Sequence, residues 1–191
     1  MIGPGFEGFG AGLVVLIVLL AALAYALVVM ALAILGRAAP VGPSWITFVV
    51  PALCLVGLGV AGYLTFVETR NVAAICGPVG DCNTVQSSPY AKLMGFIPVG
   101  LLGVLGYLAI LGAWAIAQFH GGRFSDLAAV AVFAFALFGV LFSIYLTYLE
   151  LAVILAVCAW CLTSAVIMAA LLVLTTGWAA AGLTAAENTD S

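Results

Sequence analysis

The sequence predicts an all-α, polytopic membrane protein. Of the 191 residues, 67% are hydrophobic and only 6% are charged, and the mean hydropathy is +1.39. A soluble globular domain carries about a quarter charged residues, so this composition excludes one. The net charge of -3 comes from few groups, and the sequence has no basic cluster to meet phosphate. We therefore expect membrane lipid around the chain and no nucleic acid partner.

Five apolar runs are long enough to cross a hydrocarbon core, which needs roughly 20 helical residues. They cover residues 11–35, 45–69, 96–118, 126–149 and 151–175. The first run lacks a basic leader and is longer than the roughly 7 to 15 apolar residues of a signal peptide, so we expect it to be a mature helix. Short polar connections over 36–44 and 119–125 fit turns between antiparallel neighbours, whereas residues 70–95 form a longer loop outside the membrane.

These elements predict three parts of unequal size. Residues 1–44 hold the first transmembrane helix and its connection, and residues 45–176 hold a helix bundle with the external loop 70–95. After Gly177 the chain becomes small and acidic, which predicts a flexible tail over 177–191. We expect no fused soluble redox domain.

Four of the five cysteines form two pairs in different surroundings. Cys158 and Cys161 belong to the last apolar run, and Cys76 and Cys82 lie in the polar loop. A dithiol at membrane depth and a second one on a loop suit the transfer of two electrons between a soluble protein and a lipid-dissolved carrier. The two pairs together predict a membrane thiol–disulfide oxidoreductase. Cys54, unpaired in the middle of a helix, fits a structural role.

The position of Cys158 favours a quinone as the carrier. If the last helix begins near Leu151, Cys158 lies roughly 10 Å below its mouth at 1.5 Å per residue. Water-soluble substrates do not reach that depth easily, whereas a quinone is apolar and accepts two electrons and two protons. The spacing of three residues puts Cys158 and Cys161 on one helix face, close enough for a disulfide.

Other interpretations of the cysteines stay open. The membrane pair fits two buried hydrophobic side chains, and the loop pair fits a static disulfide closed by a turn at Gly77 and Pro78. A zinc site would need four thiolates at membrane depth, and a c-type haem would need a histidine where Leu162 stands, so we expect no metal or haem. The alternative functions are a structural membrane protein and a quinone-independent transmembrane electron conduit.

Charge does not decide the orientation in the membrane. Arg37 and Arg123 fall on one side and Arg70 and Lys92 on the other, so the count of positive residues is a tie. A loop dithiol that exchanges with disulfides needs an oxidising compartment. We therefore expect the loop outside and the C-terminal tail in the cytoplasm.

The order of the motifs carries a family resemblance. The chain has a Cys-x5-Cys loop, the run CNTVQSSPY from Cys82 to Tyr90, a Gly-Phe-Ile-Pro98 helix start and a final Cys-Ala-Trp-Cys161. Over about residues 45–175 this order resembles bacterial members of the vitamin K epoxide reductase family. The resemblance implies a four-helix transmembrane bundle around a quinone pocket capped by the loop, with residues 11–35 as an additional N-terminal helix.

The resemblance also implies roles for single residues. Cys158 and Cys161 match the quinone-side pair, Cys76 and Cys82 the shuttle pair, and Ser88 the serine at the pocket mouth, where it would donate a hydrogen bond to the quinone. Cys161 would face the quinone as a thiolate. From its place near the start of the last helix, we expect Glu150 to cap that helix or to handle protons.

Family membership would further imply an electron acceptor, a donor and a location. The acceptor would be ubiquinone or menaquinone, and the donor a separate extracytoplasmic thioredoxin-fold protein, in a bacterial inner membrane where the protein supports disulfide bond formation. Two positions depart from the family pattern. Ala165 stands where relatives place a tyrosine over the quinone, and residues 95–98 lack the amide of vertebrate relatives. Both departures concern epoxide reduction and coumarin sensitivity and leave quinone reduction as the expectation.

Overall fold

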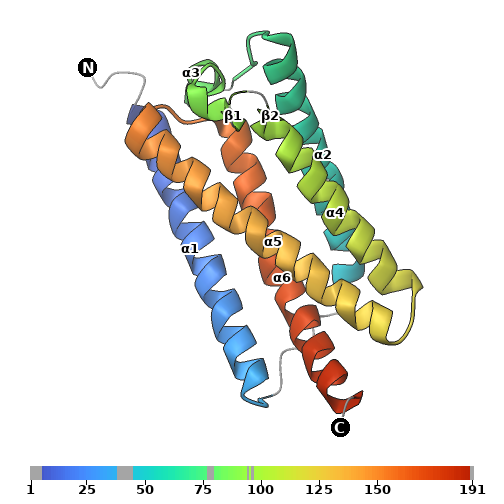
Figure 1. Cartoon of the computed structure of the whole chain (residues 1–191). Helices are drawn as coiled ribbons and strands as arrows, with labels where there is room; N and C mark the ends of the chain where they lie inside the picture. The colour runs from blue at the N-terminus through green and yellow to red at the C-terminus, as the bar shows by residue number, and fades with distance from the viewer. Residues whose placement is uncertain (1–5, 38–44, 77–79, 94, 96, 190–191) are drawn as a thin grey trace.

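The protein is a bundle of long helices with a small cap at one end (Figure 1). The computed structural model describes residues 6–37, 45–76, 80–93, 95 and 97–189. Its long helices are α1 (Phe6–Ile34), α2 (Ile46–Arg70), α4 (Val99–Phe119), α5 (Arg123–Leu149) and α6 (Ala159–Thr189). Within the described residues, five helical spans are long and apolar enough to cross a membrane. The predicted all-α, polytopic class is confirmed.

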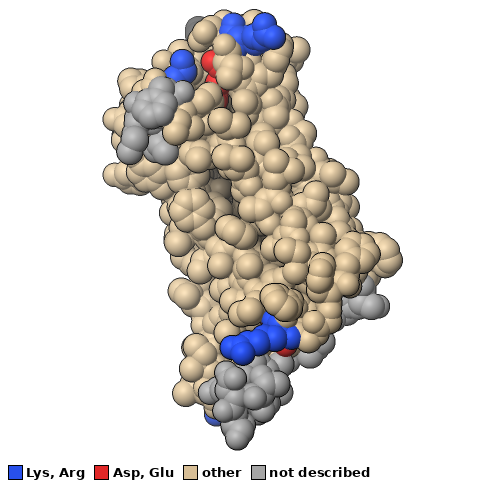
Figure 2. Space-filling view, turned by 45° about the vertical axis from the view of Figure 1, so that its right-hand side comes forward, with Lys and Arg blue, Asp and Glu red and all other residues tan. Residues whose placement is uncertain are grey.

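The cap consists of short elements from the loop between α2 and α4. These are α3 (Cys82–Gln86), the 3₁₀ turn η1 (Pro89–Ala91), and strands β1 (Lys92–Leu93) and β2 (Ile97–Pro98), which pair antiparallel. Helix α1 begins at the capped end of the bundle, and α6 ends at the opposite one (Figure 1). On the face shown in Figure 2, lysines and arginines gather at the two ends, and the surface between them is almost uncharged, as expected for a lipid-facing band.

Close helix packing creates the core of the bundle. Tyr107 of α4 is fully buried there, and its hydroxyl lies 3.0 Å from Oγ of Ser164 on α6. Gly57 of α2 makes room for the Tyr107 ring, because a Cβ at Gly57 would overlap it. Gly100 of α4 lies in the same way against the backbone of Thr65 on α2. Small residues at these crossings let α2, α4 and α6 approach closely.

The last membrane helix begins later than expected. Helix α5 passes into a π-helical turn, η2 (Glu150–Ile154), and the chain then reverses through Leu155, whose φ of 56° is left-handed. The connection is held by a hydrogen bond of 3.2 Å from Ala156 N–H to Glu150 C=O, and α6 starts only at Ala159. The expected start near Leu151 is therefore wrong, and Cys158 precedes the helix instead of lying two turns inside it.

The chain is also helical where a flexible tail was expected, because α6 continues past Gly177 to Thr189. Helix α4 starts at Val99, directly after Pro98 and close to the predicted start at residue 96. Residues 38–44 of the first predicted connection, and residues 77–79 of the predicted loop turn, lie outside the described residues.

Candidate redox site and membrane cavity

The loop cysteines are joined in a disulfide at the start of α3. Cys82, the first residue of α3, is bonded to Cys76. Asp81 caps this short helix: one carboxylate oxygen accepts from Thr84 Oγ1 at 2.6 Å and the other from Thr84 N–H at 3.1 Å. The same hydrogen bonds hold the pKa of Asp81 below its usual value. Cys82 is fully buried whereas Cys76 is half-buried, so the two sulfurs face different surroundings.

Three side chains hold the segment of the loop that precedes Cys76. The Asn83 amide accepts from Ala74 N–H at 2.7 Å and donates to Ala74 C=O at 3.4 Å. Tyr63 of α2 accepts from Ile75 N–H at 2.8 Å, and Trp160 of α6 donates its indole N–H to Ile75 C=O at 2.9 Å. The Tyr63 and Trp160 rings also contact each other, with centroids 4.8 Å apart. The loop is thus fixed to α2 and to α6, the helix that carries Cys161.

The far side of the loop touches the connection before α6. Asp81 N–H donates to Val157 C=O at 3.0 Å. Gly80 has a left-handed φ of +84°, and a Cβ there would overlap the Val157 carbonyl oxygen. Only glycine combines this backbone conformation with so close an approach. As a result, the loop backbone lies directly beside the residue that precedes Cys158.

Cys158 occupies the cap position of α6. Its carbonyl accepts from Leu162 N–H at 3.0 Å, and its sulfur accepts from Cys161 N–H at 3.4 Å. The carboxylate of Glu150 accepts from Cys158 N–H at 3.2 Å. The ligand atoms of Glu150, Cys158 and Cys161 all lie within 4.8 Å of one another. A helix N-terminus favours a negative charge, so this position favours a thiolate at Cys158.

In the connection between α5 and α6, the pKa of Cys158 is held below its ordinary value. A hydrogen bond from the Cys161 thiol is the main cause, and burial acts in the opposite direction. Backbone N–H groups at the start of α6 and the Gln86 amide of α3 add to the lowering. The groups that stabilise a thiolate therefore surround Cys158, whereas the resemblance implied the thiolate at Cys161.

The two cysteine pairs meet in one buried cluster. Cys82 and Cys158, both 0% exposed, belong to it together with Val60 and Leu64 of α2. Cys76, Trp160 and Cys161 pack against it. Residues far apart in the chain are thus brought side by side, with Cys82 on the loop side and Cys161 toward the bundle.

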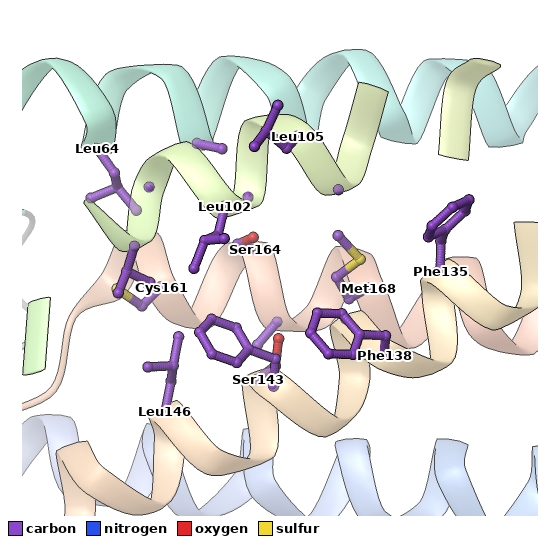
Figure 3. Close-up of a pocket in the computed structure, with 18 of the residues that line it drawn as sticks. Leu64, Leu102, Leu105, Phe135, Phe138, Ser143, Leu146, Cys161, Ser164 and Met168 are labelled. Carbon is purple, nitrogen blue, oxygen red and sulfur yellow. The ribbon is translucent and has the colours of Figure 1, made fainter. Parts of the chain in front are cut away.

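Beyond Cys161 lies a cavity of about 680 Å³ between α2, α4, α5 and α6. Figure 3 shows Cys161 at one end of this cavity and Phe135 at the other, with Leu102 and Phe138 between them. Its lining is mostly apolar, and the polar side chains in it are Glu68, Ser143, Thr147, Glu150 and Ser164. An apolar hollow of this size with a few polar groups is typical of a small-molecule site.

The sequence model of the vitamin K epoxide reductase family matches residues 48–176, more than half of the chain. The chain belongs to the vitamin K epoxide reductase family. No solved structure matches the chain. Membership in the vitamin K epoxide reductase family implies a thiol–disulfide oxidoreductase in a membrane, and the five apolar helices agree with a multi-pass membrane protein. The match begins after α1, which packs outside the four helices that surround the cavity.

The structure places Ser88 beside the large cavity of this vitamin K epoxide reductase family member, not in its lining. Ser88 lines an adjoining hollow of about 30 Å³, which it shares with Glu68, Glu150 and Cys161. Its hydroxyl donates to Val85 C=O at 2.7 Å, which is a local turn bond within the loop. A hydrogen bond from Ser88 to a ligand in the large cavity would require that bond to break.

Glu150 lies at the end of α5 and not at the start of the last helix as expected, yet its carboxylate still reaches the N-terminal end of α6 through Cys158 N–H. It is 3% exposed and lines the large cavity. Ala165 is buried in the lining of the same cavity, and Cys54 is buried in the main core.

Sequence reasoning missed Glu68. This carboxylate lies in the last turns of α2, is 6% exposed and lines the large cavity. A signal was present, because ionisable side chains within an apolar membrane-spanning run are rare and mark functional positions. Its neighbours Thr69 and Arg70 made it look like part of the polar helix end.

Proposed function

We propose that this protein oxidises a separate extracytoplasmic thioredoxin-fold protein and passes the electrons to a membrane quinone. Electrons would move through Cys76 and Cys82, then through Cys158 and Cys161, in the cytoplasmic membrane of a bacterium. The result is a disulfide in the partner, which supports disulfide bond formation outside the cytoplasm.

One observation carries this proposal: the order of the four sulfurs. Cys76 is half-buried in the loop, Cys82 and Cys158 are buried in one cluster, and Cys161 lines the apolar cavity. Thiol–disulfide exchange needs direct contact between sulfurs at each step, so an order from the loop surface to the cavity suits a relay. A static brace for the loop would not need the second pair beside it.

The first exchange takes place at the loop. A thiolate of the partner attacks Cys76, the more accessible sulfur, and breaks the Cys76–Cys82 bond. The second thiol of the partner then releases Cys76 and closes the partner's own disulfide. Two electrons have now moved to the loop, which holds Cys76 and Cys82 as thiols.

The second exchange moves the electrons inward. The Cys82 thiolate attacks Cys158 of an oxidised Cys158–Cys161 pair and releases Cys161. Cys76 then attacks Cys82, which restores the loop disulfide and releases Cys158 as a thiolate. A thiol with a low pKa is a better leaving group. The start of α6 and the Gln86 amide stabilise the Cys158 thiolate that leaves here.

The cavity fits a quinone as the final acceptor. Apolar side chains such as Leu102, Phe138 and Met168 would hold the ring, and Ser143 and Ser164 offer hydroxyls for its carbonyls. A bound quinone accepts two electrons and two protons. Cys161 would deliver the electrons as the Cys158–Cys161 bond closes, and Glu150, within 4.8 Å of both sulfurs, would take up and return the thiol protons.

Anaerobic titration of the purified protein tests this function. A reduced thioredoxin-fold protein and a short-chain ubiquinone or menaquinone analogue are added, and quinol formation is followed by absorbance. We expect one quinol for each partner disulfide formed. No quinol with either analogue would overturn the proposed electron path.

Trapping of the relay intermediate is the first testable prediction. In Cys161→Ser no Cys158–Cys161 bond can form, so the Cys158 thiolate attacks the Cys76–Cys82 bond in the reverse direction of the relay. The sulfur of Cys161 that would then displace the loop from Cys158 is absent, so the mixed disulfide should accumulate. We expect Cys82 in that bond, because it is buried against Cys158 while Cys76 is not. Peptide mapping without reduction identifies the linked pair.

Cys54→Ser is the matched control, because it removes a buried cysteine that belongs to neither pair. The non-reducing peptide map of this variant should equal that of the unaltered protein. Recovery of only the Cys76–Cys82 bond from the Cys161→Ser variant, in the presence of the partner, would mean that the loop disulfide is a static brace.

A further inference from the structure

Glu68 is a buried carboxylate that the relay does not use. It lies on α2 close to the capped end of the bundle, and one of its oxygens accepts from the backbone N–H of Gly100 at 3.1 Å. Gly100 belongs to the first turn of α4, where backbone N–H groups have no partner within the helix. The bond orients the Glu68 side chain toward the region between α2 and α4.

Among the described residues, Glu68 is the one that lines all three hollows around the site. It contributes to the large apolar cavity and to the small hollow that contains Ser88, Glu150 and Cys161. It also lines a hollow of about 770 Å³ on the loop side, whose walls include Asp81, Asn83 and other polar loop residues. Glu68 therefore stands between a polar region at the cap and the apolar interior.

The proposed relay requires protons to cross this boundary. When the loop dithiol closes to a disulfide, it loses two S–H protons on the loop side. When the acceptor becomes a quinol, two O–H bonds form in the cavity. The electrons pass through sulfur–sulfur bonds, but the protons need a separate route of ionisable groups or water.

We propose that Glu68 is the proton entry of the cavity: it takes protons from the polar hollow at the cap and passes them toward Glu150 and the acceptor. This inference rests on the proposed quinone reduction and assigns one further residue to the same site. Glu68 picks up one proton at a time on a carboxylate oxygen and returns to the carboxylate after each transfer.

The charged groups that face Glu68 come from several elements. Lys92 of β1 is close enough to interact with it electrostatically, and Asp81 lines the loop-side hollow. Glu150 and Cys161 share the small hollow with it.

A purely structural role for Glu68 would be to hold the start of α4 through Gly100. Two variants separate the roles. Glu68→Gln keeps an oxygen acceptor of the same length but does not carry a proton at that atom. Glu68→Asp keeps the carboxylate but is shorter, so the bond to Gly100 is weakened.

The second prediction is the order of quinone reduction rates. The donor is a small membrane-permeant dithiol and the acceptor a short-chain ubiquinone. We expect Glu68→Gln to lower the rate of quinone reduction by roughly 10²-fold, which is typical of removing a positioned proton carrier. Glu68→Asp should retain more activity and should keep a pH inflection of the unaltered protein that Glu68→Gln loses. Single-turnover reaction of the partner with the loop disulfide should be unchanged in both variants.

Asp126→Asn serves as the control, since Asp126 lies in the first turn of α5 at the opposite end of the bundle (Figure 1). It removes the same charge and should leave rate and pH profile unchanged. Glu68→Gln could reduce quinone as fast as the unaltered protein while Glu68→Asp reduces it more slowly. The role of Glu68 would then be only to hold the start of α4, and the inference would be overturned. Failure of the unaltered protein to reduce the quinone would instead overturn the proposed function itself.

Discussion

At the residue scale, the contact between Gly80 and Val157 decides how closely the loop approaches the second cysteine pair. Any side chain at Gly80 meets the Val157 carbonyl oxygen, and the left-handed φ of +84° adds backbone strain. The loop and the connection before α6 are thus joined at a position that tolerates no Cβ. Their separation would carry Cys82 away from Cys158.

The third prediction follows from this contact. We expect Gly80→Ala to slow exchange between the loop and Cys158 and to lower the yield of the Cys82–Cys158 bond in a Cys161→Ser background. Rapid acid quenching and non-reducing peptide mapping measure both. Backbone strain alone costs roughly 1–2 kcal/mol, so a control must carry the same strain.

Gly95→Ala provides that control. Gly95 also has a left-handed φ, of +81°, but a Cβ there has nothing within 4 Å. The rate of thiol–disulfide exchange between the loop and Cys158 in this variant should stay close to that of the unaltered protein. Equal slowing by both variants would show that strain in the loop, and not the approach to Val157, controls the exchange.

Single residues of the site differed in how far the sequence predicted them. The four cysteines were singled out from their spacing and resemblance, and the structure brings the two pairs into one cluster; their catalytic roles stay predictions. The carboxylates were predicted less well: Glu150 was named but placed at the start of the last helix instead of the end of α5, and Glu68 was overlooked. Their roles depend on which carboxylates the fold turns inward, and an isolated acidic residue near a helix end carries no sign of that.

At the element scale, hydropathy predicted the helices well and their junctions poorly. The runs over 45–69 and 126–149 correspond closely to α2 (Ile46–Arg70) and α5 (Arg123–Leu149). The segment from Glu150 to Cys158 is as apolar as a helix, although it contains a π turn and a reversal at Leu155. Because no glycine or proline marks this reversal, hydropathy alone does not reveal that α6 starts at Ala159.

Trp160 connects two elements in addition to packing against Tyr63. Its indole N–H bonds Ile75 C=O, so α6 holds the loop directly before Cys76. Our fourth prediction is that Trp160→Phe, which keeps a ring against Tyr63 but loses this bond, loosens the loop by about 0.5–1.5 kcal/mol. The rate of amide hydrogen exchange at Ile75 and its neighbours should rise by the factor that corresponds to this loss of free energy.

Trp114→Phe is the matched control, because the indole N–H of Trp114 is buried without a hydrogen-bond partner among the described residues. It removes the same group but no bond, so exchange at Ile75 should not change. Unchanged exchange at Ile75 in the Trp160→Phe variant would contradict the role given to the indole.

At the scale of the whole molecule, α1 lies outside the family match yet packs against the site. A Cβ at Gly8 would lie 3.1 Å from Gly80, and one at Gly12 would lie 2.8 Å from the Leu151 side chain. Val157 packs between them and the start of α6. The additional helix therefore packs against both the loop at Gly80 and the connection that carries Cys158.

The fifth prediction concerns orientation. The loop cysteines and the start of α1 lie at the same end of the bundle (Figure 1). If that end is extracytoplasmic, an impermeant maleimide added to intact cells after mild reduction should label Cys76 more than the buried Cys82. Mass spectrometry of the purified protein measures the labelling of each.

Cys54 acts as an internal control, because it is buried in the core of the bundle and should stay unlabelled in folded protein. A Cys76→Ser, Cys82→Ser double variant should give no signal. Labelling of Cys76 only after cell lysis would place the loop in the cytoplasm and reverse the proposed topology.

The walls of the large cavity include side chains that are themselves on the outer surface of the bundle, among them Leu105, Phe135 and Phe138. The cavity is therefore reached sideways, between helices, from the lipid phase. For an acceptor that enters this way, the relevant concentration is its mole fraction in the surrounding amphiphile. If the acceptor is a quinone, adding detergent at constant quinone would lower its mole fraction in the micelles. Apparent affinities would then change with the amount of detergent and become comparable only when expressed per amphiphile.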